Sequence, residues 1–511
     1  MTDVLLGQAY YLRFDPKLRR AGQPYPPLGT LYAASYLRER GFAVALFDAM
    51  LARDEREWAR SLDRTRPRIA VIYEDSFNYL TKMCLLRMRQ AALTMIRLAG
   101  ERGCPIVVSG SDATDHPDIY LSAGARAVIT GEGEVTLAAL AERLLRGESP
   151  DVPGVAFLDD SGQTRRTAAR PFVRALDNLP LPAWDLADID RYGRIWRDRH
   201  GYHSMNVATT RGCPYHCNWC AKPIYGQRYA VRSPERVVEE IATLKRRYRL
   251  DHVAFVDDVF GLQPGWIESY ARLAREADAV VPFRCLMRAD QVKRETVSAL
   301  AGAGGRTVWI GAESGSQRVL DAMEKGIRVE QIRDATHLLH EAGIHVGFFL
   351  QFGYPGETWD DIDATLRLVR DVCPDDIGVS VSYPLPGTKF HARVSAELEA
   401  KQNWFDSNDL AMMYRATFDP EVYRLLHRVV HHEFRARRLA RGLTPLLARP
   451  WRARSLPLRR MAAWSYNRVA LFRAHRRLRR IAVEPPHAPG PRRLVPLLSP
   501  AAAATPSRQD D

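Results

Sequence analysis

The stretch that decides the fold reads Arg211-Gly-Cys213-Pro-Tyr-His-Cys217-Asn-Trp-Cys220, with three and then two residues between its cysteines. It directly follows an apolar run, residues 205–210, that is typical of a buried strand. A loop with these spacings can wrap a compact cluster, and thiolates are the usual ligands of iron–sulfur clusters. Three cysteines leave the fourth iron of a cubane without a protein ligand, so the loop predicts that another molecule binds there.

Two other interpretations of the cysteines compete with the cluster. The chain has seven cysteines, an odd and scattered set that suits no complete disulfide framework, whereas a tight trio points to a metal. A structural zinc site would need a fourth ligand, and the adjacent His216 would strain the loop. The remaining alternative is a chance group of buried cysteines. An aromatic residue, Trp219, directly before the last cysteine favours the cluster.

Around this loop, residues 203–385 alternate apolar strands with helical stretches. Helices are expected to begin at Ser233, which precedes a proline, and at Thr358, where Asp361 completes a capping-box pattern. The six expected strands are residues 205–210, 253–256, 283–287, 307–311, 345–351 and 377–382. Six strand–helix units predict a partial (β/α)6 barrel of the TIM type, with its chemistry at the C-terminal ends of the strands.

Residues 1–140 show the same alternation, with a helix at residues 28–40 that ends at Gly41. The expected strands are residues 4–7, 43–47, 69–73, 105–109 and 127–130. This pattern predicts a Rossmann-like, doubly wound parallel sheet, which binds ligands at the carboxyl ends of its strands. Small and polar residues follow two of these strands and suit ligand binding or plain turns equally: Ser109, Gly110, Ser111, Thr114, Gly131 and Glu132.

The chain is therefore expected to be an α/β protein with five segments. They are an N-terminal sheet domain (1–140), a linker with a small hairpin (141–195), the partial barrel (196–395), a helical Arg-rich region (396–483) and a disordered tail (484–511). No run of 18 or more apolar residues and no secretory signal is visible, so a cytoplasmic protein is expected.

The positive charge is confined to the C-terminal region. From Glu421 onward there are 20 arginines, no lysine and five acidic residues, a net charge of +15, so residues 1–420 of this +14 chain sum to −1. This asymmetry argues against a general nucleic-acid-binding protein and favours a local anionic partner.

The cysteine loop resembles that of the radical S-adenosylmethionine (SAM) superfamily. Further segments are similar to its cobalamin-binding branch, which includes carbon methylases, enzymes like the anaerobic Mg-protoporphyrin ester cyclase, and hopanoid-tailoring enzymes. These segments are residues 25–30, 131–134, 311–317, 323–326, 352–358 and 384–388, and the resemblance covers about residues 1–395.

The resemblance implies that Cys213, Cys217 and Cys220 hold a [4Fe-4S] cluster whose open iron binds SAM, and that one electron yields a 5′-deoxyadenosyl radical. The expected reaction is cobalamin-dependent methylation of an unactivated carbon. Oxidative cyclisation or rearrangement on the same fold is the alternative. A small-molecule or lipid substrate and a flavodoxin- or ferredoxin-type electron donor are implied.

The resemblance also assigns SAM-binding roles. Trp219 is expected to set the loop against the adenine, or to pack beneath it. Glu313, with Ser314 beside it, would bind the ribose or amino group, and the alternative is a solvated surface carboxylate. Arg288 would pair with the SAM carboxylate through its planar fork, and the alternative is a structural ion pair.

Two further pairs of residues are candidates for a role in the active site. Gly353 and Gly356 would allow close backbone approach or positive φ, although a plain turn is equally consistent. Asp257 and Asp258 end the second strand and are the predicted catalytic pair, holding substrate or handling a proton. Helix capping is the rival interpretation for the two carboxylates.

Cobalamin is expected without a histidine ligand. Many cobalamin domains carry Asp-x-His-x-x-Gly after the first strand, but this chain lacks it, and His116 is the one histidine before position 200. The cobalamin tail would lie near residues 109–114 and 131–134. The alternative is a degenerate nucleotide-type domain that only packs on the barrel.

The Arg-rich stretch 452–480 contains Trp464, Tyr466, Leu471 and Phe472. On a helix it could contact an anionic membrane surface or bind an anionic partner, or its aromatic residues could pack on the barrel. Two other functions fit less well. A tRNA methylthiotransferase would carry three more cysteines in its N-terminal domain, which here has Cys84 and Cys104 alone. A cobalamin or redox sensor would need no open iron.

Overall fold

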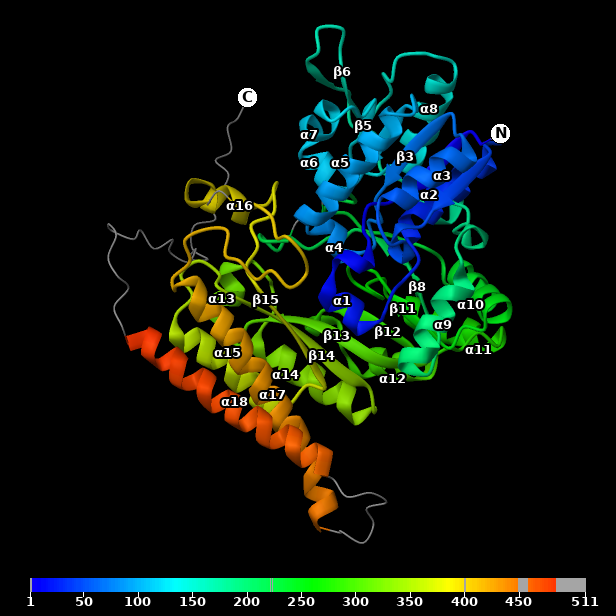
Figure 1. Cartoon of the computed structure of the whole chain (residues 1–511). Coiled ribbons are helices and arrows are strands. Elements are labelled where there is room, and N and C mark those ends of the chain that lie inside the picture. The colour runs from blue at the N-terminus through cyan, green and yellow to red at the C-terminus, as the bar shows by residue number, and fades with distance from the viewer. Residues whose placement is uncertain (1, 221, 223, 399–400, 449–457, 484–511) are drawn as a thin grey trace, which may run out of the picture.

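The computed structural model of the chain describes residues 2–220, 222, 224–398, 401–448 and 458–483. Figure 1 shows an N-terminal sheet with its helices set above a second, curved sheet, and two long C-terminal helices that run along the outer side of the second unit. Each sheet is parallel over most of its strands, and the predicted α/β fold class is confirmed.

The N-terminal sheet has the strand order β2-β1-β3-β4-β5-β6-β7. Side chains of its central strands alternate between two cores, one under α2 and α8 and the other under α3 and α5, so the sheet is doubly wound. Its parallel strands are β1 (Val4–Gly7), β2 (Val44–Phe47), β3 (Ile69–Tyr73), β4 (Ile106–Ser109) and β5 (Ala127–Ile129). The helices around it are α1 (Pro16–Ala21), α2 (Leu28–Glu39), α3 (Arg56–Thr65), α4 (Tyr79–Lys82), α5 (Leu86–Gly100), α6 (Ser111–Asp115), α7 (Pro117–Ser122) and α8 (Glu134–Leu145).

The stretch predicted as a linker contributes to the same sheet. Strands β6 (Val155–Leu158) and β7 (Thr164–Arg166) form an antiparallel hairpin, and β6 pairs with β5. Helix α9 (Ile189–His200) follows and leads into the barrel. The expected hairpin is therefore present, but it extends the sheet to seven strands because Val155 and Phe157 bury their side chains in its core.

The second sheet is an open, curved half-barrel of six parallel strands in sequential order. The first and last strands do not pair, which agrees with the predicted partial barrel. The strands are β8 (Ser204–Val207), β11 (His252–Phe255), β12 (Phe283–Met287), β13 (Gly305–Glu313), β14 (His345–Phe352) and β15 (Asp376–Val381). The helices are α10 (Pro234–Tyr248), α11 (Trp266–Glu276), α12 (Arg294–Ala303), α13 (Gln317–Ala322), α14 (Val329–Glu341), α15 (Trp359–Val372) and α16 (Lys389–Val394).

Both predicted helix starts in this unit are present. The Ser233 side chain accepts from the Arg236 amide at the start of α10. At α15, Thr358 and Asp361 form the predicted capping box. These caps satisfy amide groups that the first helical turn leaves without partners.

The C-terminal region forms α17 (Pro420–Ala448) and α18 (Leu458–Val483), which pack against each other around a small core of their own. Within the described residues, no helix is both long and apolar enough to cross a membrane. The tail predicted to be disordered, residues 484–511, lies outside the described residues.

Candidate active site

The cysteine loop leaves the first barrel strand and is closed at its base by a short ladder. Strand β9 (Thr210–Arg211) pairs antiparallel with β10 (Ala230–Val231), so the chain between them forms one loop. Gly212 has φ +78°, and a Cβ there would lie 2.4 Å from the carbonyl oxygen of Arg228. The base of the loop therefore admits glycine alone at this position.

The three cysteines share one environment. Cys213 and Cys217 are buried and Cys220 is half-buried. Burial raises the pKa of Cys220 to about 12, and the charges of Cys213 and Cys217 add to the rise, so the three thiols lie within electrostatic reach of one another. His216, the weighed fourth zinc ligand, is exposed and bonds Gln227 through Nδ1.

This donor set fits a cubane cluster. No group of three or more His, Cys, Asp or Glu side chains in the described parts of the chain is arranged to hold a single metal ion. A [4Fe-4S] cluster does not require such convergence, because each cysteine binds a different iron. Three thiols on one loop, close enough to interact, supply three of its four corners.

Asn218 fixes the middle of the loop to the end of the fourth barrel unit. Its amide N–H donates to the Met323 carbonyl (3.0 Å), and its side-chain nitrogen donates to the Ala322 carbonyl (2.7 Å). The Tyr354 hydroxyl donates to the Asn218 side-chain oxygen at 2.9 Å. The buried Asn218 therefore anchors the loop between its second and third cysteines, a role that the sequence analysis did not assign.

Arg211 joins the loop to the N-terminal sheet. Its buried guanidinium pairs with Glu132 and Glu134, which follow β5, and aromatic rings surround it. Glu132 also accepts from the Val173 amide at 2.7 Å. Glu132, predicted to bind the cobalamin tail, thus has both carboxylate oxygens engaged by protein groups.

Glu313 and Lys325 form a buried ion pair beside the loop, with Nζ 2.9 Å from Oε1. Burial alone would lower the pKa of Lys325, but the charges of Glu313 and Cys217 raise it, which places this ammonium group near the cluster ligands. Lys325 also lies 6.0 Å from the ring centre of Trp219. The half-buried Trp219 packs against the main core, as its alternative role required.

Arg288 and Ser314 are engaged by the protein itself. The Arg288 guanidinium pairs with Asp290 at 3.0 Å, donates to the Lys325 carbonyl at 3.0 Å and stacks on the Tyr215 ring. Ser314 is fully buried, and its hydroxyl meets that of Thr365 at 3.0 Å. This arrangement matches the structural alternative weighed for Arg288, and its SAM-binding role stays a prediction.

The predicted catalytic carboxylates point in different directions. Asp257 accepts from the amides of Thr209 and Thr210, both at 2.7 Å, so it holds the start of β9, and burial raises its pKa to about 6. Asp258 pairs with Lys82 of the N-terminal domain at 2.7 Å. The two therefore do not act as a facing pair, and catalysis by either stays a prediction.

Gly353 and Gly356 form the turn after β14, with φ values of +83° and +80°. The Gly353 amide donates to Glu357 at 2.6 Å. Tyr414 donates from its hydroxyl to the Gly353 carbonyl. Positive φ, one of the two expected reasons for glycine here, is present at both positions.

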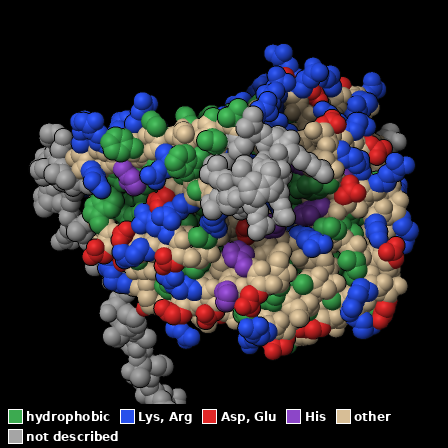
Figure 2. Space-filling view, turned by 90° about the horizontal axis from the view of Figure 1, so that it is seen from below, with side chains coloured by type: hydrophobic (Ala, Val, Ile, Leu, Met, Phe, Trp, Pro, Cys, Tyr) green, Lys and Arg blue, Asp and Glu red, His purple; other side chains and the backbone are tan. Residues whose placement is uncertain are grey.

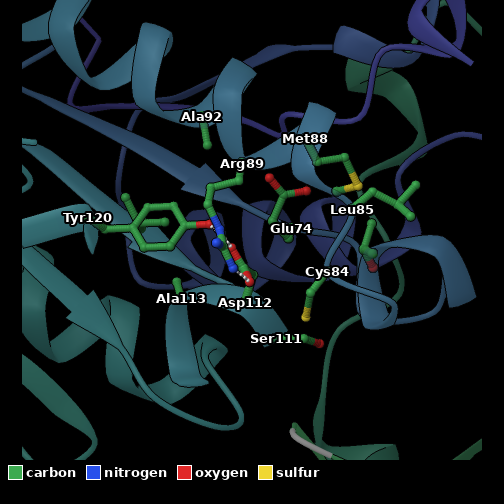
Figure 3. A pocket seen from close by; sticks show the side chains of 12 residues that line it. Glu74, Cys84, Leu85, Met88, Arg89, Ala92, Ser111, Asp112, Ala113 and Tyr120 are labelled. Atoms are coloured by element: carbon green, nitrogen blue, oxygen red, sulfur yellow. Dashed lines mark hydrogen bonds and ion pairs between the residues drawn. The ribbon is translucent and has the colours of Figure 1, made fainter. Parts of the chain in front are cut away.

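A small cavity lies at the carboxyl edge of the N-terminal sheet, and its lining combines polar residues after β4 with apolar side chains of α5 (Figure 3). Arg89 lies beside Asp112, which also accepts from the Tyr120 hydroxyl. Ser111 lines the same cavity. Of the predicted residues at this edge, Ser109 is the last residue of β4, Gly110 and Ser111 follow it, and Thr114 accepts from the Gly131 amide at 3.3 Å.

Glu74, which the sequence analysis did not single out, also lines this cavity. One of its oxygens accepts from the Ala9 amide at 2.9 Å, and the other is buried without a partner. Burial raises the pKa of Glu74 to about 8. A Cβ at Gly110 would lie 2.8 Å from the Glu74 side chain. Glycine is therefore needed at this position, where the ends of β3 and β4 lie side by side.

Residues 207–369, which include the cysteine loop, match the family model described as the radical SAM superfamily. Residues 207–369 therefore form a radical SAM domain. The resemblance found from the sequence is thereby confirmed.

Relatives with assigned names extend the match beyond the radical SAM domain. The uncharacterized methyltransferase PH0819 of Pyrococcus horikoshii is 26% identical, over 83% of this chain and 95% of its own. The hopanoid C-3 methylase of Methylococcus capsulatus is 27% identical, over 78% of this chain and 74% of its own. The cobalamin-dependent SAM radical enzyme OxsB, solved with aqua-cobalamin bound, shares the fold at a TM-score of 0.70 and 19% identity, over 94% of this chain and 72% of that one.

Within this radical SAM enzyme, the residues missed by sequence reasoning share one property. Arg211 and Asn218 act through partners that are distant in sequence, Glu134 and Ala322, and Lys325 acts through Glu313, 12 residues earlier. Asn218 lies between two cysteines and Arg211 two residues before the first, so their positions in the motif were the one available signal.

Proposed function

We propose that this radical SAM enzyme binds a [4Fe-4S] cluster through Cys213, Cys217 and Cys220, cleaves SAM reductively and methylates an unactivated carbon with cobalamin as second cofactor. The observation that carries the proposal is the three-cysteine loop at the C-terminal end of the first barrel strand, closed at its base by β9 and β10. Three protein ligands leave one iron of the cluster for SAM.

When bound, the cluster supplies the electron that breaks a carbon–sulfur bond of SAM, and cobalamin carries the methyl group. The chain's own side chains would orient SAM and stabilise the reduced cluster. Lys325 places a positive charge near Cys217, which favours the reduced, more negative cluster. Glu313, held by Lys325, offers its carboxylate to a hydroxyl or ammonium group of SAM. Trp219 and Arg288 border the same region.

Two observations support cobalamin on the N-terminal sheet. The strand order reverses direction at β1 and β3, and ligands of such sheets bind in the crevice at that point. Glu74 directly follows β3 there and has a buried oxygen that lacks a partner. Near it, residues 109–111 and Thr114 would meet the cobalamin tail. The loops that directly follow β1, β3, β4 and β5 contain no histidine, so we propose a cobalt without a histidine ligand.

The electron must come from an external donor, for which we propose a flavodoxin or ferredoxin. The substrate class that fits the proposal is a small molecule or a lipid, since the names of two similar proteins indicate methylation and one of them acts on a hopanoid.

The deciding experiment uses protein purified without oxygen, with cobalamin supplied and the cluster reconstituted. Dithionite and SAM are added, and 5′-deoxyadenosine, S-adenosylhomocysteine and bound corrinoid are measured. The triple change Cys213→Ala, Cys217→Ala, Cys220→Ala should abolish deoxyadenosine formation, whereas Cys104→Ala, outside the loop, should not.

The products separate the candidate reactions. Deoxyadenosine together with S-adenosylhomocysteine and one corrinoid per chain supports methylation. Deoxyadenosine without S-adenosylhomocysteine, once a substrate is supplied, supports oxidative cyclisation or rearrangement instead. Failure of the wild-type chain to assemble a cluster would overturn the proposal.

A further inference from the structure

Helix α18 buries one face against α17. Leu471, Ala474 and Leu478 are buried there and meet Val422, Leu425 and Val429 of α17. Residues spaced by three or four lie on one side of a helix, so this packing accounts for a single face of α18. This packing does not involve the opposite face of α18, which carries a second set of apolar side chains.

The outer face of α18 exposes large apolar side chains to solvent. Of the eleven exposed large hydrophobic residues in the described parts of the chain, six lie on this helix: Leu458, Met461, Trp464, Tyr466, Val469 and Phe472. Tyr466 and Phe472 are each 67% exposed, so the expectation that the aromatic residues here pack on the barrel is wrong for both. At 100° per residue, Leu458, Val469 and Phe472 fall on the side opposite the buried face, and Met461 lies at the flank of that side.

Arginines flank this apolar stripe. The helix carries eight arginines and no acidic residue, and all eight are exposed. Of these eight arginines, only Arg477 pairs with an acidic side chain of the described residues, Glu421. Figure 2, which views the molecule from below, shows hydrophobic and basic side chains interspersed on this side. A face that combines unpaired arginines with protruding apolar side chains is suited to a surface that is both anionic and apolar.

We propose that the outer face of α18 docks on an anionic membrane surface, with the helix lying parallel to the bilayer. The apolar stripe enters the boundary between headgroups and acyl chains, and the arginines meet lipid phosphates. At about 1.5 Å per residue, the 26-residue helix offers a contact about 39 Å long. Nucleic acid would use the arginines but would leave the aliphatic Leu458 and Val469 without a role.

A groove beside the stripe strengthens the anionic part of the inference. It lies between α17 and α18, and its lining includes Arg428, Arg473, His432 and Tyr466. Neither Arg428 nor Arg473 pairs with an acidic side chain of the described residues, so a phosphate group would find two unpaired guanidinium groups there. The groove and the stripe face solvent along the same helix, and one bilayer surface can occupy both.

The test is flotation of the full chain with lipid vesicles. Wild-type protein should float with vesicles that contain phosphatidylglycerol and not with pure phosphatidylcholine, and an ionic strength of about 1 M should release it, because the screening length falls to about 3 Å. The double change Val469→Ser, Phe472→Ser should lower the bound fraction by about tenfold. Arg473→Gln with Arg476→Gln should lower it as well.

Matched control variants test whether vesicle binding depends on α18 or on exposed side chains elsewhere on the surface. Leu158→Ser removes an exposed apolar side chain from β6, and Arg246→Gln with Arg247→Gln removes the same charge from α10; neither should change flotation. Circular dichroism checks that α18 still folds. The proposal is overturned if the wild-type chain ignores anionic vesicles, if the controls lose binding equally, or if the α18 changes instead dissociate a dimer. None of these outcomes depends on cluster chemistry, so the proposed function is tested separately.

Discussion

Arg211, two residues before the first cysteine of the loop, donates from Nη2 to Oε1 of Glu134 at 2.7 Å, and the two side chains are 4% and 2% exposed. Glu134 is the first residue of α8, where the positive end of the helix dipole favours a carboxylate. Glu132 completes the group as a second partner of the same guanidinium. The cluster loop and the carboxyl edge of the N-terminal sheet are therefore joined by a buried charge network.

Changing Glu134→Gln should destabilise the fold and loosen the cluster loop. The amide keeps the shape of the side chain, but it accepts a weaker, neutral hydrogen bond from the Arg211 guanidinium, which costs about 1 kcal/mol even though Glu132 still balances the charge. Urea unfolding and iron content per chain are the measurements. Glu142→Gln, an exposed change on the same helix, serves as the control. Equal unfolding midpoints for the two variants would show that the network contributes nothing to stability.

Changing Gly212→Ala should prevent cluster assembly. The new Cβ would lie 2.4 Å from the Arg228 carbonyl oxygen, and the residue would also have to adopt φ +78°. Gly41→Ala imposes a similar strain at φ +84° but meets no atom within 4 Å. It should cost only about 1 kcal/mol and leave iron binding intact. If both variants bind iron normally, the tight base of the loop has no part in holding the cluster.

Local patterns were sufficient to predict most of the fold. The strand expected at residues 283–287 is β12 with the same bounds, because a short apolar run after a helix has few other conformations. The β6–β7 hairpin joined a sheet instead of remaining in a linker, since its pairing with β5 is a tertiary contact. The hydrophobic pattern of the sequence determines which side chains are buried, but it does not determine which distant strand they contact.

The side-chain partners at the site could not be predicted in the same way. Arg211 and Glu132 are 79 residues apart in sequence, and Arg288 contacts the Lys325 carbonyl across 37 residues. Such pairs depend on how two loops approach in three dimensions. Motif positions alone therefore suggested ligand roles for Arg288 and Glu132, whereas the folded chain gives both of them protein partners.

Changing Lys325→Met should weaken SAM binding by about tenfold or more, because Glu313 loses the ammonium group that holds its carboxylate in position. Equilibrium dialysis of SAM against the reconstituted enzyme measures this. Lys389→Met is the matched control, since Lys389 pairs with Glu324 on the surface. Unchanged SAM affinity in a folded Lys325→Met protein would remove this pair from the SAM site.

The last prediction concerns the pH dependence of stability, which Glu357 should control in part. This side chain is fully buried, one oxygen accepts from the Gly353 amide at 2.6 Å, and the other has no partner. Burial raises the pKa of Glu357 from 4.5 to about 8. The folded state therefore keeps its proton more tightly than the unfolded chain does.

The sign of the effect follows from this shift. The stabilisation is fully present below pH 4.5 and is lost as the pH rises through about 8. Glu357→Gln keeps the shape without the proton equilibrium, so at pH 9 it should be more stable than the wild type by at least about 1 kcal/mol. Urea unfolding at pH 6 and pH 9 measures the difference, with the exposed Glu330→Gln as control. Parallel pH profiles for the wild type and Glu357→Gln would mean that the carboxyl group is already ionised in the folded chain.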